Sequence, residues 1–185
     1  MNMKIEDLLG TRERIAIMNK ILYIEELFGV SQISKELKLS KGLTSKYFNI
    51  LVRNKIIRRS GRKFAPIKSP KLSVLKILLT INSIVNDLMR IFRKYPFVIS
   101  AGIYGSAARG LNTENSDIDL WMKTRKCKES EKAGLFSEIK SLSNKISPLL
   151  IDENGLADLK KKDPLFYYSL HFGTIKIYGE ENENI

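Results

Sequence analysis

The C-terminal part of the chain contains the run AGIYGSAARGLNTENSDIDL at residues 101–120. The preceding run FVISAGIY (97–104) is rich in apolar and β-branched residues, which predicts a strand that ends at Gly105-Ser106. Glycine lets the backbone come close to a ligand, and the amides that follow can point at phosphate oxygens. We therefore expect a phosphate-binding turn at Gly105 and Ser106.

Two carboxylates follow this turn on the next predicted strand, DIDLWMK (117–123). Asp117 and Asp119 are two residues apart, so strand alternation puts both on one face, while Ile118 and Leu120 point into the core. Two like charges repel, and a divalent cation between them relieves the repulsion. A turn followed by solvated acids on an edge strand is the alternative, but the two features on consecutive strands favour a site for Mg²⁺ with substrate phosphates.

The rest of the C-terminal part predicts an α+β domain, a small mixed sheet with flanking helices, over residues 70–185. Ser69-Pro70 marks a helix start, and the apolar run to Tyr95 before Pro96 predicts a connecting helix over 70–95. A helix over 129–145, a strand over 147–152, short helices and a final strand in TIKIYG follow.

The N-terminal part, residues 1–69, predicts a winged helix-turn-helix domain. Helical spacing indicates helices over 11–28 and 31–39, a turn at Ser40-Lys41-Gly42 and a helix over 43–54. The last of these is predicted to pack through Leu43, Tyr47, Ile50 and Leu51. The segment IIRRSGRKFAPI then predicts a hairpin with Gly61 at its tip, which would be the wing.

The charge of the chain is concentrated in this N-terminal part. Residues 1–70 hold 15 Lys and Arg against 6 Asp and Glu, while residues 71–185 hold 17 against 14. A Lys-rich solvated surface or a protein-interaction module is the alternative, but helix, turn, helix and basic hairpin in this order favour duplex DNA as partner, bound by a homodimer. The predicted DNA-binding residues are Lys41, Thr44, Ser45, Lys46, Asn49, Arg53, Arg58, Arg59, Arg62 and Lys63.

Composition excludes several other classes of function. One cysteine, Cys127, and one histidine, His171, cannot build a zinc cage, and we interpret both as structural. The sequence shows no apolar run of about 20 residues and no secretory leader, so we expect a cytoplasmic protein without a membrane segment.

The run GSAARGLNTENSDIDL resembles the GS-x10-DxD signature of minimal nucleotidyltransferases of the DNA polymerase beta superfamily. The resemblance covers roughly residues 72–178, and with the N-terminal domain the chain is similar to archaeal-type helix-turn-helix nucleotidyltransferases. It implies that Gly105, Ser106 and Arg109 bind a nucleoside triphosphate, and that Asp117 and Asp119 are catalytic and hold Mg²⁺. It also implies a possible acceptor protein, as in antitoxin-type members that modify a HEPN-type ribonuclease toxin.

The family's active members add a third carboxylate from a later strand, at a position that aligns with Ser147. A hydroxyl is a poor substitute for the general base and metal ligand that a carboxylate supplies. Asp152 at the end of that strand is the alternative, although its side chain has the opposite parity to Ser147. Two hypotheses therefore stay open: a transferase that moves a nucleoside monophosphate to an acceptor, and a catalytically inactive regulator that senses a nucleotide or partner.

Aromatic residues lie near the predicted site. Trp121 alternates to the same face as the two aspartates and could form a wall of the site. Phe166, Tyr167 and Tyr168 predict packing against the core first, with stacking on a nucleotide base as the less favoured alternative.

Overall fold

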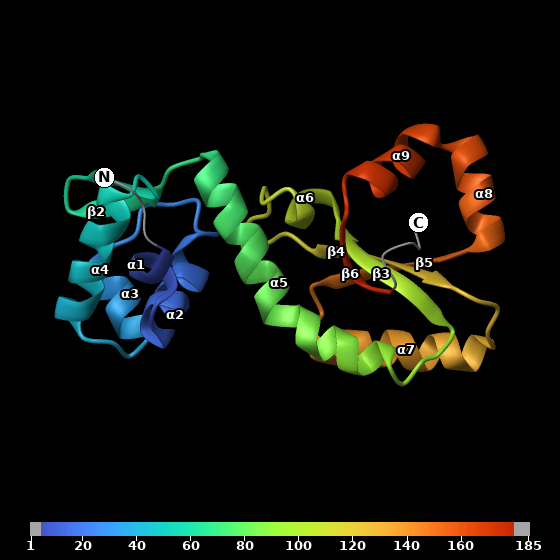
Figure 1. The fold of residues 1–185 in the computed structure, drawn as a ribbon. Coiled ribbons are helices and arrows are strands. Elements are labelled where there is room, and N and C mark those ends of the chain that lie inside the picture. The colour runs from blue at the N-terminus through green and yellow to red at the C-terminus, as the bar shows by residue number, and fades with distance from the viewer. Residues whose placement is uncertain (1–4, 180–185) are drawn as a thin grey trace. The chain divides into compact units, whose positions relative to one another are not determined.

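The computed structural model describes residues 5–179, which fold into two compact units that divide between Lys76 and Ile77. The first unit contains helices α1 (Ile5–Leu9), α2 (Arg12–Ile21), α3 (Val30–Glu36) and α4 (Lys41–Arg53), followed by strands β1 (Ile57–Ser60) and β2 (Lys63–Pro66). The strands form an antiparallel hairpin with Ser60 opposite Lys63, and Gly61 at its tip has a φ of 60°. Figure 1 shows these elements at the blue end of the chain.

The predicted helix over 11–28 ends early, at Ile21, because the chain makes a nonlocal contact instead. Thr11 caps its start, with its hydroxyl accepting from the Arg14 amide at 3.3 Å. Phe28 forms an antiparallel bridge with Phe64, with backbone hydrogen bonds of 3.0 and 2.8 Å. The next helix, α3, has Gly29 as its N-cap and no side-chain capping hydrogen bond. Tertiary pairing of Phe28 with the hairpin thus overrides the helical pattern.

The buried face of α4 differs from the predicted one. Its start is capped by the Ser40 hydroxyl, which accepts from the Leu43 amide at 3.1 Å, so Lys41 and Gly42 lie in the first helical turn and not in a connecting turn. The buried stripe is Thr44, Tyr47, Phe48 and Leu51, while Leu43 is exposed and Ile50 is half-buried. Phe48 sets this rotation, because its ring packs edge-on against Phe28 (5.6 Å) and Phe64 (4.9 Å).

Helix α5 (Pro70–Phe92) contributes residues to both units. Its start matches the sequence expectation, since the Ser69 hydroxyl accepts from the Leu72 amide at 3.3 Å and Pro70 is the first helical residue. By length and composition alone it could cross a membrane, with a mean hydropathy of 1.4. It buries Ile84, Leu88, Ile91 and Phe92 in the core of the second unit, as the core helix of a globular protein does.

The second unit is built on a four-stranded mixed sheet in the order β5-β4-β3-β6. It comprises β3 (Val98–Tyr104), β4 (Ile118–Thr124), β5 (Ile146–Asp152) and β6 (Ile175–Tyr178). β3 is antiparallel to β4 and β6, and β4 is parallel to β5. The helices are α6 (Gly105–Ala108), α7 (Glu129–Leu142), α8 (Glu153–Lys162) and α9 (Pro164–Phe172).

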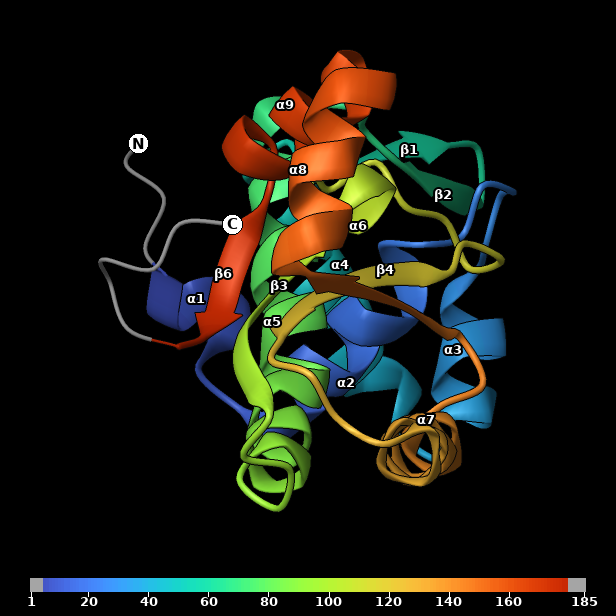
Figure 2. The ribbon, with the colours of Figure 1, turned by 90° about the vertical axis from the view of Figure 1, so that its right-hand side faces the viewer.

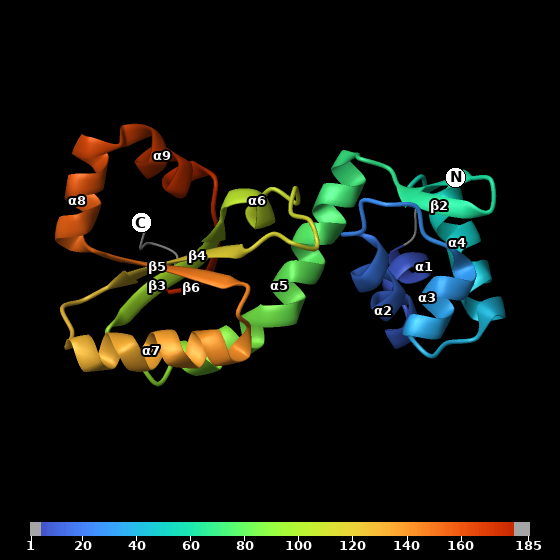
Figure 3. The same ribbon diagram turned by 180° about the vertical axis from the view of Figure 1, so that it is seen from behind.

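Helices cover the two faces of this sheet differently. Residues of α5 and α7 form the main core with one face, where Leu120 and Met122 are buried. Residues of α8 and α9 cover part of the other face around Trp121. Figures 1, 2 and 3 show α7 on one side of the sheet and α8 with α9 on the other. The unit is therefore an α+β mixed sheet with flanking helices, as the sequence predicts.

Candidate active site

The predicted turn and the two carboxylates meet where β3 ends and β4 begins. Tyr104, the last residue of β3, lies opposite Asp119 in the antiparallel ladder. Asp117 directly precedes β4, which starts at Ile118 rather than one residue earlier. Asp119 and Trp121 share the face that α8 and α9 partly cover, while Leu120 and Met122 point into the opposite core. The fold thus brings the two halves of the motif together.

Gly105 packs directly against the Asp119 carboxylate. Its φ of 68° lies in the left-handed region, and a Cβ at this position would collide with the Asp119 side chain. Any other residue would suffer backbone strain as well as this collision. Glycine is therefore required here both by the backbone conformation and by the close approach of the carboxylate.

The segment after Gly105 is a short helix, α6, and not an open turn. Ser106 is half-buried within it, and its carbonyl accepts from the Leu111 amide at 2.9 Å. The exposed Arg109 folds back so that its Nε donates to the Gly105 carbonyl at 3.3 Å. The predicted nucleotide-binding residues Gly105, Ser106 and Arg109 are therefore close neighbours beside Asp119.

A second turn positions Asp117. The Thr113 amide donates to the Ser116 hydroxyl at 2.9 Å, and the Ser116 amide donates to the Thr113 carbonyl at 3.2 Å. The Ile118 amide then donates to the Lys145 carbonyl at 2.8 Å, which ties the start of β4 to the start of β5. These hydrogen bonds fix the backbone before and after Asp117, and so fix the point from which its side chain extends.

The charge of Asp117 acts on the Asp119 carboxylate. Partial burial, followed by the nearby charge of Asp117, raises the pKa of Asp119. Burial and the Asp119 charge also raise the pKa of Tyr104. Asp119 thus carries a negative charge that its surroundings disfavour, and a bound cation would remove that penalty.

Tyr104 is a site residue that the sequence analysis missed. It lies beside Asp119, and its ring meets the Phe166 ring edge-on at 5.9 Å. An aromatic residue at the end of an apolar strand looks like an ordinary core residue. The available signal was its position directly before Gly105, at the point where that strand delivers the chain to the predicted site.

The two candidate positions for the third carboxylate, Ser147 and Asp152, lie at different places along β5. Ser147 on β5 is the register partner of Asp119 on β4, and it is exposed. Asp152 lies opposite Thr124 at the far end of the strand, and its carboxylate accepts from the Gly155 amide at 2.7 Å, which caps α8. Between residues 5 and 179, no three side chains of Asp, Glu, His or Cys come together as a metal cage. Asp152 thus lies five residues along β5 from Ser147 and serves as the N-cap of α8.

The aromatic residues Trp121 and Phe166 belong to the apolar cluster between the sheet and helices α8 and α9. Trp121 is buried, packs against Gly102 and donates from Nε1 to the Thr174 hydroxyl at 2.5 Å. Phe166 packs in the same cluster. Tyr167 stacks parallel to His171 at 6.2 Å, while Tyr168 is exposed. Among residues 5–179, neither His171 nor Cys127 belongs to a group of three or more side chains that could hold a metal ion.

The predicted DNA-binding residues fall into two groups in the first unit. On α4, Lys41, Lys46, Asn49 and Arg53 are exposed and Ser45 is half-exposed. Thr44 is the exception, because it is buried and its hydroxyl donates to the Ser40 carbonyl at 3.1 Å. Its placement on the outer face was wrong, since Phe48 rotates this side of the helix into the core.

The hairpin carries the second group. Arg58, Arg59, Arg62 and Lys63 are all exposed, and none of them forms an ion pair with a residue that the structure describes. Arg59 is partly held in place, because its Nε donates to the Gly61 carbonyl at 3.1 Å and its guanidinium lies 5.8 Å from the centre of the Phe64 ring. The hairpin therefore presents a cluster of positive charge that no neighbouring acid neutralises.

Comparison with known proteins agrees with the fold of the second unit. The sequence model of the family "Polymerase beta, Nucleotidyltransferase" matches residues 86–183, which is more than half of the chain. The chain therefore belongs to the polymerase beta nucleotidyltransferase family. No protein of curated function matched its sequence.

Two solved structures are similar to parts of the chain. A putative nucleotidyltransferase from Sulfolobus solfataricus has 15% identity and a TM-score of 0.42, and the match covers 64% of this chain and 97% of that one. A mutant of the toxin-antitoxin MntA-HpeT has 14% identity and a TM-score of 0.39, with 52% and 74% of the two chains covered.

Proposed function

We propose that this protein is a DNA-binding regulator whose C-terminal unit binds a nucleoside triphosphate as its magnesium complex. The observation that supports the nucleotide site best is the packing of Gly105 against the Asp119 carboxylate, with Asp117 close enough to raise the pKa of Asp119. A backbone that approaches this closely, next to two repelling carboxylates, suits a ligand that carries phosphate and brings a divalent cation.

The residues present fit magnesium as a metal shared with substrate. Asp117 and Asp119 supply two carboxylates, and the described residues offer no third acidic ligand at this place. Mg²⁺ is usually held by one or two carboxylates with phosphate oxygens and water in the remaining positions. When bound, the ion would neutralise negative charge on the phosphates that leave during nucleotidyl transfer.

The protein's own groups would bind and orient the triphosphate. Gly105 allows the phosphates to approach the backbone, and Ser106 offers a hydroxyl at the first turn of α6. The Arg109 guanidinium, which lies beside the Gly105 carbonyl, can reach a phosphate by rotating its exposed side chain. These roles follow the family signature on the residues that match it.

Calorimetry tests the nucleotide site. We expect ATP or another triphosphate to bind the full chain only with magnesium, and the double variant Asp117→Asn/Asp119→Asn to lose this binding. Asp158→Asn in α8 is the control, because it removes one exposed acid away from the site and should leave binding unchanged. Equal binding by the double variant and the wild type would remove the two aspartates from the site.

Turnover should be slow because Ser147 occupies the position at which the resemblance predicts a carboxylate that acts as general base. General-base assistance is typically worth about 100- to 10,000-fold in rate. With α-labelled triphosphate and a co-expressed neighbour protein as acceptor, the wild type should transfer little label, and Ser147→Asp should transfer more because position 147 lies opposite Asp119. Strong labelling by the wild type that Ser147→Ala leaves intact would show that the reaction uses another base, and the inactive regulator would be the wrong hypothesis.

The DNA-binding part of the proposal concerns the first unit. It is supported by the exposed basic residues on one side of α4 and on the hairpin, in the element order of a winged helix-turn-helix. We propose that α4 contacts the major groove through Lys41, Ser45, Lys46, Asn49 and Arg53, while the hairpin contacts phosphates. A homodimer on two half-sites follows as the expected assembly from that geometry.

A further inference from the structure

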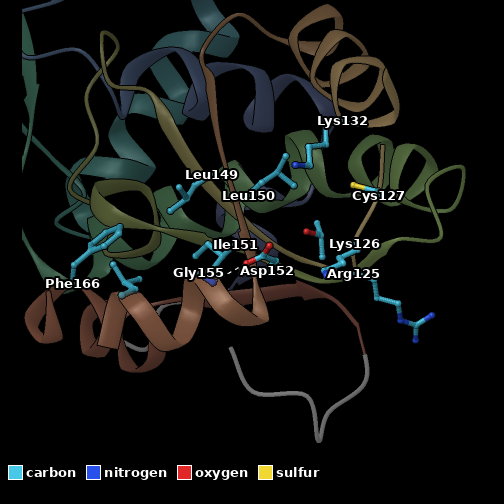
Figure 4. Close-up of a pocket in the computed structure, with 12 residues that line it drawn as sticks. Arg125, Lys126, Cys127, Lys132, Leu149, Leu150, Ile151, Asp152, Gly155 and Phe166 are labelled. Carbon is cyan, nitrogen blue, oxygen red and sulfur yellow. Dashed lines mark hydrogen bonds between the residues drawn. The ribbon is translucent and has the colours of Figure 1, made fainter. Parts of the chain in front are cut away.

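The second unit contains a pocket that the proposed nucleotide site does not use. It has a volume of about 350 Å³ and lies where the parallel strands β4 and β5 end, beside the starts of α7 and α8 and beneath α9. In open α/β sheets, ligands commonly bind beyond the carboxyl ends of parallel strands. The volume is within the range of small-molecule sites. Figure 4 shows the pocket with its lining side chains.

The pocket is distinct from the pair of aspartates. Its strand-end residues Thr124 and Asp152 face each other in the ladder five residues beyond Asp119 and Ser147. At about 3.3 Å per residue this places them roughly 16 Å along the sheet, while Leu149, at the other end of the pocket, lies two residues or roughly 7 Å beyond Ser147. Neither Asp117 nor Asp119 lines the pocket. A ligand bound at the strand ends would therefore not occupy the place of the metal and its phosphates.

The lining has an apolar part and a charged part. Leu149, Ile151, Leu159 and Phe166 supply an apolar surface, with Phe166 at one end in Figure 4. Arg125, Lys126 and Lys132 supply positive charge at the other end, against the single acid Asp152. The hydrogen bond from Lys132 to Glu129, at 2.7 Å, raises the pKa of Lys132, so its ammonium stays charged. The Asp152 carboxylate accepts from the Gly155 amide and stays charged, and Glu129 pairs with Lys132, so the positive charges of Arg125, Lys126 and Lys132 exceed these two acids by one.

From this division we infer that the pocket binds a small organic phosphate with a flat apolar ring, at a second site separate from Asp117 and Asp119. The ring would lie against Leu149 and Phe166, and the phosphate would lie near Lys126 and Lys132. The ligand would also reach the first site indirectly, because the Phe166 ring contacts Tyr104, whose neighbour in the ladder is Asp119. The pocket is thus suited to an effector whose binding is transmitted to the nucleotide site through Phe166 and Tyr104.

Cys127 makes this inference testable, because it lines the pocket and is the only cysteine in the chain. The experiment measures how fast the neutral reagent 4,4′-dithiodipyridine modifies the full-length protein. We expect 1-naphthyl phosphate to slow the reaction about tenfold when it saturates the pocket, since a bound ligand blocks the thiol. Inorganic phosphate and 1-naphthol at the same concentration should not, because each carries only half of the required chemistry.

Two sets of variants complete the test. Lys126→Glu should weaken the protection by about tenfold, since it reverses a charge at an exposed position. The matched change Lys140→Glu, an exposed lysine of α7 that does not line the pocket, should leave it unchanged. Protection should persist in Asp117→Asn/Asp119→Asn. The inference is overturned if naphthyl phosphate gives no protection, if inorganic phosphate protects equally, or if the double variant loses protection.

Discussion

Gly105 is the residue on which the geometry of the nucleotide site depends most. Gly105→Ala adds a Cβ that collides with the Asp119 carboxylate and forces alanine into a left-handed conformation. The backbone conformation alone costs about 1–2 kcal/mol. We expect the free energy of unfolding to fall by at least that amount and magnesium-dependent triphosphate binding to be lost. Urea unfolding and calorimetry measure the two effects.

Gly42→Ala is the matched control for that variant. Gly42 has open space around its Cβ position and lies in the first turn of α4 with an ordinary negative φ. Alanine there should preserve stability and triphosphate binding. If Gly105→Ala behaved in the same way as Gly42→Ala, the close approach to Asp119 would have no functional meaning.

Asp119 should make the folded state less stable as pH rises in the absence of magnesium. Because the folded pKa of Asp119 is raised, the native state holds its proton more tightly than the unfolded state does. Stability therefore decreases as pH rises from the ordinary aspartate pKa of about 4 through the folded pKa. Asp117→Asn removes part of the cause and should stabilise the protein at neutral pH by a few tenths of a kcal/mol, because solvent screens these partly exposed groups.

The measurement is urea unfolding in magnesium-free buffer at a series of pH values. Glu26→Gln, which removes an exposed acid from the first unit, should show no such gain. A destabilised Asp117→Asn at neutral pH would mean that the Asp117 carboxylate makes a favourable contact that outweighs the repulsion.

At the scale of elements, the hairpin β1-β2 should control the strength of DNA binding. Replacing Arg58, Arg62 and Lys63 by Ala removes three exposed charges and spares Arg59, whose side chain packs on Phe64. We expect weaker binding to all duplex sequences, and a plot of log affinity against log salt that is flatter by about 2 to 3. Gel shifts or fluorescence anisotropy at several salt concentrations give both quantities.

Helix α8 supplies the control for the hairpin variant. Lys160, Lys161 and Lys162→Ala removes three exposed positive charges from the second unit. It lowers net charge by the same amount but should leave the affinity and its salt dependence nearly unchanged. Equal losses in both triple variants would show that only the total charge of the chain matters, and the hairpin would not be a DNA-binding element.

At the scale of the whole molecule, the connection between the two units lies inside α5 and not at its start. The first unit extends to Lys76, and the sequence predicted a boundary between residues 69 and 70. Tyr23 donates to the Lys76 carbonyl at 3.3 Å, and Leu72 and Leu75 are buried. The first two turns of this helix therefore complete the first unit.

We expect a fragment of residues 1–78 to be more stable than one of residues 1–69. Loss of buried leucines typically costs about 2–5 kcal/mol each, so the shorter fragment should be less stable by several kcal/mol. Thermal unfolding followed by circular dichroism compares the two, and Leu78→Ala in the longer fragment is the control because Leu78 is exposed. Fragments of equal stability would place the boundary at residue 69 after all.

Features that depend on neighbours along the chain can be predicted from the amino-acid sequence. Such local patterns include the spacing of Asp117 and Asp119, Gly105 before them and the capped start of α5 at Ser69-Pro70. The order of helices and strands in the second unit is also predicted from local patterns. The buried face of α4, the early end of α2 and the position of Ser147 depend instead on contacts between segments that are far apart in the sequence. Thr44 is buried and Phe28 leaves its helix because the Phe28, Phe48 and Phe64 rings pack together across segments far apart in sequence. In the same way, the pairing of β4 with β5 sets Ser147 beside Asp119 and carries Asp152 to the far end of the strand, because register depends on contacts between strands.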